Sequence, residues 1–156
     1  MKLPPDVQFH EDIHLLVWKP LGVVNEAVVN EILAFLADKE AKSTKPFNRF
    51  TDTSAQDAVE LTFKYIFHVA LCRRLSYAGH PPVKSAFFVT HPQIAHLVKI
   101  HALVTDHSPL HVEMFEEREA AAKWLGVPLK RLGESSRELR NYTTGDVPLT
   151  SDEAAT

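Results

Sequence analysis

Three short strand-like segments constrain the fold of this chain most. Residues Ile13–Trp18 and Ser85–Val89 are almost continuously apolar, and Phe47–Thr51 lies between them in the sequence. Apolar runs of this length are typical of strands covered on both faces, as in the middle of a parallel sheet. We therefore expect the three segments to be adjacent strands of one sheet.

The stretches between these segments carry helical periodicity, as parallel strand pairing requires. Apolar residues recur there at intervals of three and four, which places them along one face of a helix. The four expected stripes are Val24, Val28, Ile32, Phe35 and Leu36; Phe63, Ile66, Phe67, Ala70 and Leu71; Ile94, Leu97, Val98 and His101; and Ala120, Ala121, Trp124 and Leu125.

Two further segments, around Val7–Phe9 and Leu110–Met114, alternate apolar with polar residues and complete the sheet. The expected order is β-β-α-β-α-β-α-β-α, an α/β fold with about five mostly parallel strands and four helices. A single domain over residues 1–127 accommodates it. Residues 128–156 are polar, so we expect a flexible C-terminal extension there.

The overall composition argues against several classes of protein. The 156 residues are 45% hydrophobic and carry a net charge of −3, which gives no general attraction to nucleic acid. No apolar stretch approaches the roughly 18 residues of a membrane span, and the first residues lack the apolar core of a signal peptide. We expect a cytoplasmic protein.

Sequence signals for catalysis and metal binding are absent. The chain has no P-loop, no dinucleotide-binding glycine motif and no nucleophile elbow. His91, His96 and His101 recur every five residues, which turns them away from one another on a helix, and Cys72 is the lone cysteine. We therefore expect no catalytic centre, no metal site and no cofactor.

Three pieces of the sequence, in this order, resemble one known family. They are Asp52-Thr53-Ser54 after the third strand, the strand Val83–Val89, and the segment VEMFEEREAAAKWLGV near residues 112–127. Together with the element order they resemble the STAS superfamily, the fold of bacterial anti-sigma-factor antagonists. The resemblance is to its SpoIIAA-like branch, some of whose folds are similar to lipid-binding Sec14 domains. It implies a regulatory protein-interaction module.

The phosphorylation motif of that family is incomplete in this chain. Antagonists carry D-x-S-G followed by D-S-S-G, and a partner kinase phosphorylates the first serine of the second motif. Aligning Asp52 and Ser54 with the first motif places Glu60, Leu61 and Thr62 in the second. Leu61 has no hydroxyl, so only Ser54 or Thr62 could serve as the acceptor. The alternative is that both simply cap helix or turn backbone.

The helix expected over residues 63–75 carries a second apolar face. Tyr65, Val69 and Cys72 lie beside its main stripe, and a helix apolar on two sides is usually covered on two sides. Ordinary burial within the domain would explain this face, and so would a protein partner, a second copy of the chain or a fatty ligand.

Two functions are consistent with these observations. The first is a non-catalytic regulatory or protein-interaction module that docks through the helix after Asp52-Thr53-Ser54. The second is a carrier or sensor of a small apolar, lipid-like ligand held between helix 63–75 and the sheet. The candidate residues are Asp52, Thr53, Ser54, Glu60, Thr62, Tyr65 and Val69.

Overall fold

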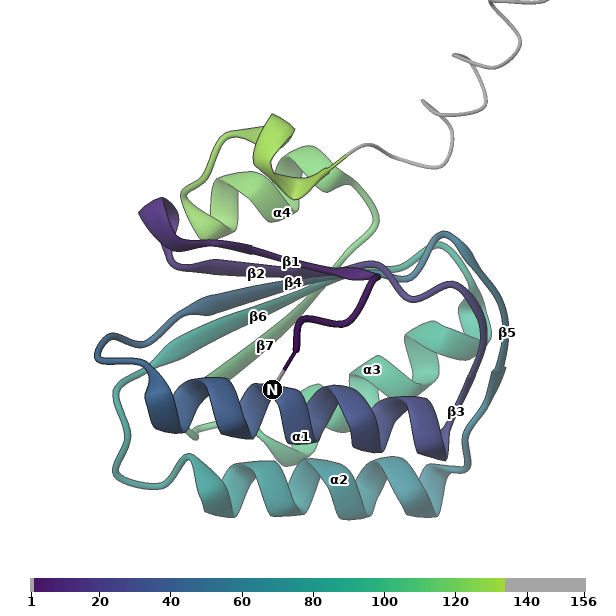
Figure 1. Cartoon of the computed structure of the whole chain (residues 1–156). Helices are drawn as coiled ribbons and strands as arrows, with labels where there is room; N and C mark the ends of the chain where they lie inside the picture. Colours follow the sequence, from purple (N-terminus) through teal and green to yellow (C-terminus); the bar gives the residue numbers. More distant parts are fainter. Residues whose placement is uncertain (1, 134–156) are drawn as a thin grey trace, which may run out of the picture.

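The computed structural model describes residues 2–133, which fold around a five-stranded sheet of order β1-β2-β4-β6-β7 (Figure 1). β1 pairs antiparallel with β2, and every other pair in this sheet is parallel. The strands are β1 (Val7–His10), β2 (Leu15–Trp18), β4 (Asn48–Asp52), β6 (Val83–Phe88) and β7 (Leu110–Phe115). The prediction that the three apolar segments form adjacent strands is confirmed, because β2, β4 and β6 are neighbours.

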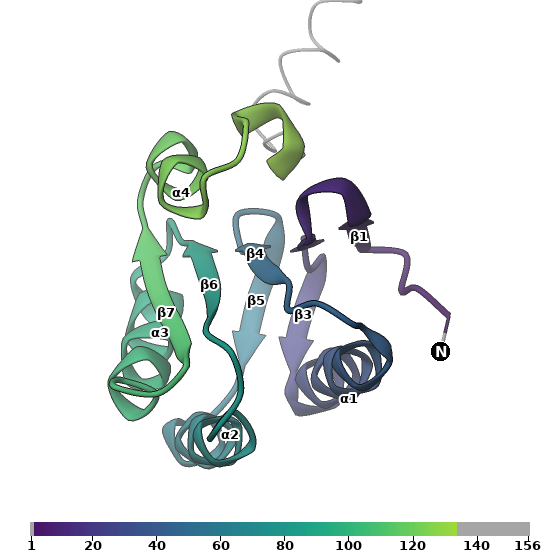
Figure 2. The same cartoon turned by 90° about the vertical axis from the view of Figure 1, so that its left-hand side faces the viewer.

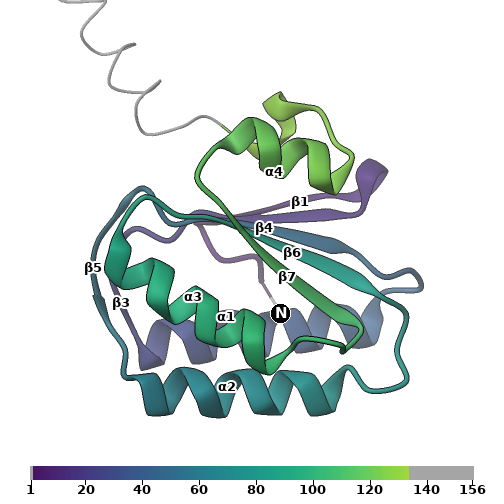
Figure 3. The same ribbon diagram turned by 180° about the vertical axis from the view of Figure 1, so that it is seen from behind.

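Helices cover both faces of the sheet, in the predicted order. One face carries α1 (Glu26–Lys42), α2 (Phe63–Ser76) and α3 (Pro92–Val104), and the other carries α4 (Arg118–Leu125) (Figure 2). α1 and α3 lie near the sheet, whereas α2 lies farther out, across the space between them. α2 packs chiefly against α3, beside which it runs in Figure 3. None of the described helices combines the length and apolar character needed to cross a membrane.

A second, two-stranded parallel sheet was not predicted. β3 (Gly22–Asn25) pairs with β5 (Gln56–Glu60), and this ribbon links the carboxyl ends of β2 and β4 to the starts of α1 and α2 (Figure 1). The assignment of Val24 to the first helical stripe is therefore wrong: the helix begins at Glu26, with Asn25 as its N-cap. Both strands are short and pair across a long stretch of sequence, so neither carries a pattern that reveals the pairing.

The packed body extends past the boundary expected at residue 127. Leu132, in the short 3-10 helix η2 (Leu129–Leu132), is only 2% exposed and belongs to the core between the sheet and α4. η2 is also held by Arg131, which forms two hydrogen bonds of 2.9 and 2.6 Å with the carboxylate of Asp12. The turn was not predicted because the sequence after Pro128 is mostly polar. The extension was expected over residues 128–156, and its part from residue 134 onward lies outside the described residues.

Candidate functional site

The loop after β4 is closed by its own side chains. The Oδ1 atom of buried Asp52 accepts hydrogen bonds from the backbone N–H of Ser54 at 2.9 Å and from its hydroxyl at 2.5 Å. The hydroxyl of Thr53 donates to the carbonyl of Phe88 at 2.8 Å. These contacts form an Asx-type turn anchored on β6, so all three residues have structural roles in this loop.

Asp52 also connects this loop to the helix on the far face of the sheet. Its Oδ2 atom lies 3.9 Å from Nε of Arg118 in α4, and both side chains are buried. Arg118 in turn donates hydrogen bonds to the carbonyls of Leu132 and Gly133. A buried ion pair therefore joins the loop to α4, and the hydrogen bonds of Arg118 join α4 to the end of η2. Nothing in the sequence pattern singled out Arg118.

The two candidate hydroxyls are not brought together by the fold. Ser54 precedes β5 and Thr62 follows it, so the strand separates them. The hydroxyl oxygen of Thr62 accepts from the N–H of Tyr65 at 3.1 Å and thereby caps α2. Glu60 is exposed, and Leu61 is half-buried.

The predicted main stripe of α2 is divided between the core and the surface. Ile66 and Ala70 are buried as expected, and Val69 of the second face is buried beside them, which is the ordinary burial within the domain that the sequence left open. The use of Val69 as a partner contact is therefore wrong. The outward side chains are Phe63, Phe67, Leu71 and Leu75, at 62%, 53%, 41% and 68% exposure. We call these four residues the α2 ridge. Because both stripes of the helix are apolar, periodicity alone could not show which one faces the core.

Tyr65 lies between the two faces and ties α2 to α1. Its hydroxyl is 2.5 Å from Oδ1 of Asn30 and 3.2 Å from the carbonyl oxygen of Glu26. The side chain is half-buried, and desolvation raises the pKa of its hydroxyl above the ordinary value. Tyr65 is thus a contact between two helices within the domain.

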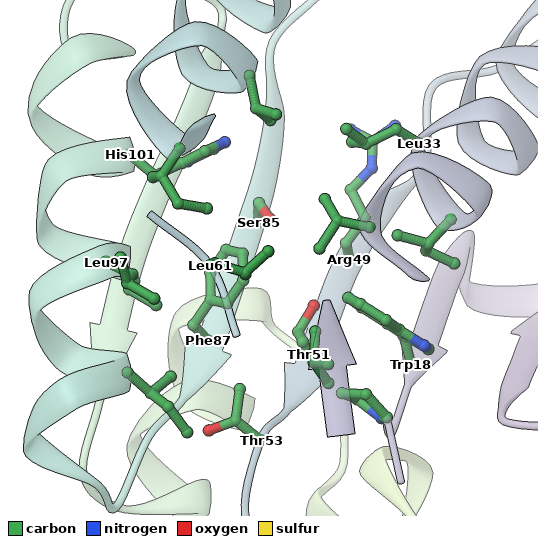
Figure 4. A pocket seen from close by; sticks show the side chains of 18 of the residues that line it. Trp18, Leu33, Arg49, Thr51, Thr53, Leu61, Ser85, Phe87, Leu97 and His101 are labelled. Atoms are coloured by element: carbon green, nitrogen blue, oxygen red, sulfur yellow. The ribbon is translucent and has the colours of Figure 1, made fainter. Parts of the chain in front are cut away.

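A cavity of about 120 Å³ lies between the main sheet and helices α1, α2 and α3 (Figure 4). Most of its lining is apolar and includes Leu16, Ile32, Leu61, Ile66, Val69 and Leu97. Its position is the one at which the sequence analysis placed an apolar ligand, between the helix over 63–75 and the sheet. α2 forms the outer wall of this cavity.

The cavity also has a polar region, formed by residues that the sequence analysis did not single out as binding residues. Arg49 in β4 is 2% exposed, and its Nη2 atom is paired with Oε1 of Glu40, which also accepts a hydrogen bond from Tyr77. Burial lowers the pKa of Arg49 from its ordinary value. His101 in α3 is 7% exposed, and burial, with the neighbouring Arg73, lowers its pKa to about 3.

The surface around the α2 ridge has an uneven charge. The sequences of α2 and α3 contain Lys64, Arg73, Arg74 and Lys99 but no aspartate or glutamate. Arg74 is held by hydrogen bonds to the carbonyls of Val104 and Asp106. The helix pair is therefore basic, although the chain as a whole carries a net charge of −3.

Within residues 2–133, no cluster of three or more His, Cys, Asp or Glu side chains could hold a metal ion.

Comparison with known proteins identifies the fold. No family model matches the chain, and no curated protein is similar enough in sequence to count as a relative. A solved structure from Shewanella loihica, described as a DUF3478-family protein with a SpoIIAA-like fold, superposes with a TM-score of 0.50. The two chains are 14% identical over 76% of this chain and 90% of the other. This chain therefore has a SpoIIAA-like α/β fold, as its resemblance to the STAS superfamily predicted.

Proposed function

We propose that this protein is a non-catalytic regulatory module that binds a protein partner through the α2 ridge. The observation that carries the proposal is the exposure of four large apolar side chains on one helix. Each recurs four residues after the last, so Phe63, Phe67, Leu71 and Leu75 form a continuous row. An exposed apolar row beside charged residues is typical of an interaction site. The SpoIIAA-like fold gives this reading its context.

The charge around the ridge favours a partner with acidic residues. α2 presents exposed Lys64, and Lys99 of α3 is also exposed, with no carboxylate in either helix. A second copy that docked helix against helix would bring like charges together, which is unfavourable at an interface. A partner surface with apolar anchors and flanking Asp or Glu would satisfy both features. We infer such a partner rather than a homodimer.

The proposed module acts without the serine switch of the family. Leu61 stands at the acceptor position, Thr62 caps α2 and Ser54 closes a turn. Because both hydroxyl oxygens have structural hydrogen bonds, we infer that binding depends on surface complementarity rather than on phosphorylation of these residues. The proposed location is the cytoplasm.

The test is a charge substitution on the ridge with a matched control. Phe67→Glu places a charge in the middle of the row, and Leu21→Glu places one at a side chain of 65% exposure outside α2. Affinity capture with cross-linking from Lys64 should recover an acidic protein with the wild type and with Leu21→Glu, and not with Phe67→Glu. Undiminished capture by Phe67→Glu would contradict the proposal, and so would a wild-type dimer, seen by sedimentation, that Phe67→Glu dissociates.

A second function, that of a carrier or sensor of a small apolar molecule, is supported by the cavity of about 120 Å³ beneath α2. Its mostly apolar lining with a few convergent polar groups is that of a small-molecule site, and because drug-sized ligands occupy roughly 300–1,000 Å³, the molecule must be a very small one. Native mass spectrometry of protein from its own host would test it directly. A mass matching the bare chain alone, under conditions that keep a known apolar complex intact, would argue against it.

A further inference from the structure

The polar region of the cavity contains hydrogen-bond donors that lack acceptors. Within residues 2–133, the Nε and Nη1 atoms of Arg49 have no hydrogen-bond partner, and neither does Nδ1 of His101. Both side chains line the cavity and both are more than nine-tenths buried. Buried polar atoms are nearly always paired, so unpaired ones next to a cavity need an explanation.

The remaining contact of His101 shows that its unpaired nitrogen is a donor. Nη1 of Arg73 lies 3.4 Å from Nε2 of His101. A guanidinium can only donate, so Nε2 is the acceptor. The imidazole is neutral at pH 7, because burial and Arg73 lower its pKa to about 3. Its single proton is therefore assigned to Nδ1. All three unpaired atoms are donors.

The local charge points the same way. Among the described residues, the charged groups that act on Arg49 are the guanidinium of Arg73 and the carboxylate of Glu40, with the Tyr77 hydroxyl beside them. This group of side chains thus contains two guanidinium cations and one carboxylate anion. An additional carboxylate would balance the charge and supply the missing acceptor oxygens.

The arrangement of the polar groups leaves room for a head group and a tail. Arg49 and Ser85 are direct partners in the pairing of β4 with β6, and Arg49 and His101 lie on opposite sides of the pocket (Figure 4). Beyond them the lining is mostly apolar, with Leu97 and Ile94 on α3 and Ile66 on α2, and its polar residues there, Thr51, Thr53 and Gln56, are uncharged. A ligand that matches this cavity would therefore carry a charge at the end next to Arg49 and His101 and be uncharged over the rest of its length.

We propose that the cavity binds a small apolar carboxylic acid, whose carboxylate accepts hydrogen bonds from Arg49 and His101. Its hydrocarbon part lies beneath α2, among the aliphatic side chains. The inference rests on the proposed carrier or sensor function and names the ligand class. Size sets the limit, because an engineered apolar cavity of about 150 Å³ in another protein holds one benzene. The cavity of about 120 Å³ is smaller than that, so the acid must be no bulkier than benzene, as butyrate and isobutyrate are.

The test compares acids with neutral molecules of the same shape. Butyrate, isobutyrate, 1-butanol and isobutanol are titrated into the full chain by calorimetry at pH 7 and constant ionic strength. We expect each acid to bind at least about tenfold more tightly than its alcohol, as charge-assisted hydrogen bonds in a buried site predict. Equal affinity for acid and alcohol would refute the assigned ligand class while leaving the carrier function standing. Absence of binding by all four would overturn both.

Substitutions locate the head group. Arg49→Met keeps an unbranched apolar stem and removes the donors, and should lower the affinity for butyrate at least about tenfold while changing that for 1-butanol little. Arg131→Met is the matched control, because it removes a guanidinium that pairs with Asp12 on the other face of the sheet. An Arg49→Met variant that binds butyrate as tightly as the wild type would refute the proposal. Should Arg49→Met fail to fold, His101→Phe takes its place, with the same expected loss and the same refuting result.

Discussion

Leu132 provides a sharp test of where this domain ends. The side chain is 2% exposed and packs with Leu15, Phe50 and Leu125 between the sheet and α4. Replacing a buried leucine by alanine costs about 2–5 kcal/mol, and the cost is lowest where the surroundings can collapse. η2 is a single turn near the end of the described chain, so we expect about 2–3 kcal/mol. With a typical dependence on urea of about 2 kcal/mol per molar, the unfolding midpoint should fall by about 1–1.5 M.

Leu129 is the matched control, because it begins the same turn and is 39% exposed. Leu129→Ala should cost less than about 1 kcal/mol, as expected of a surface position. Urea unfolding of both variants, followed by tryptophan fluorescence, measures the two free energies of unfolding. Equal effects of the two substitutions would refute the reasoning, since η2 would then not be part of the core. A loss confined to Leu132→Ala would show that a domain cut at residue 127 lacks a core side chain.

Two further predictions concern the interior. Burial lowers the pKa of His101 from 6.5 to about 3, so below pH 6.5 the unfolded chain binds a proton that the folded chain does not. The free energy of unfolding should then fall by up to about 1.4 kcal/mol per pH unit down to about pH 3, with no such contribution above pH 6.5. Urea unfolding at pH 7, 6 and 5 should show a smaller decline for His101→Phe than for the wild type; equal declines would contradict this. Leu61→Ser should cost about 1–2 kcal/mol, because half-buried apolar surface lining the cavity is lost. Ala58→Ser, at an exposed position, is the control for Leu61→Ser. Equal free energies of unfolding for the two variants would mean that the Leu61 side chain contributes no packing.

The main sheet could be predicted because its signal is local and strong. Ile13–Trp18 and Ser85–Val89 are apolar enough to require cover on both faces, and the helices that provide it lie next to them in the sequence. The N-cap Thr62 was recognisable because a capping side chain acts within one turn of its own helix. By contrast, β3 and β5 are short strands whose partners lie about 35 residues apart in the sequence, as Val24 and Val59 do, and no local pattern reveals such a pair.

The candidate site was less predictable, for a different physical reason. Arg49 sits in a strand whose two neighbours in the sheet are buried, where a charge is costly. The sequence shows only an arginine between an asparagine and a phenylalanine, which also suits an exposed strand. Its burial follows from a partner on α1, Glu40, and from the aromatic ring of Tyr77. Such a group is identified only when the tertiary contacts are known.

Helix α2 links the two proposed functions physically. Its inner face, with Ile66 and Val69, lines the cavity, and its outer face carries the α2 ridge. α2 packs chiefly on α3, and the cavity separates it from the sheet. A ligand in the cavity and a partner on the ridge would therefore contact opposite faces of one helix. Any shift of α2 that the ligand favours changes the surface offered to the partner. Thermodynamic linkage then requires the partner to change the affinity for the ligand by the same factor. In this fold, a cavity beneath the docking helix could thus couple ligand to partner without a phosphorylated serine.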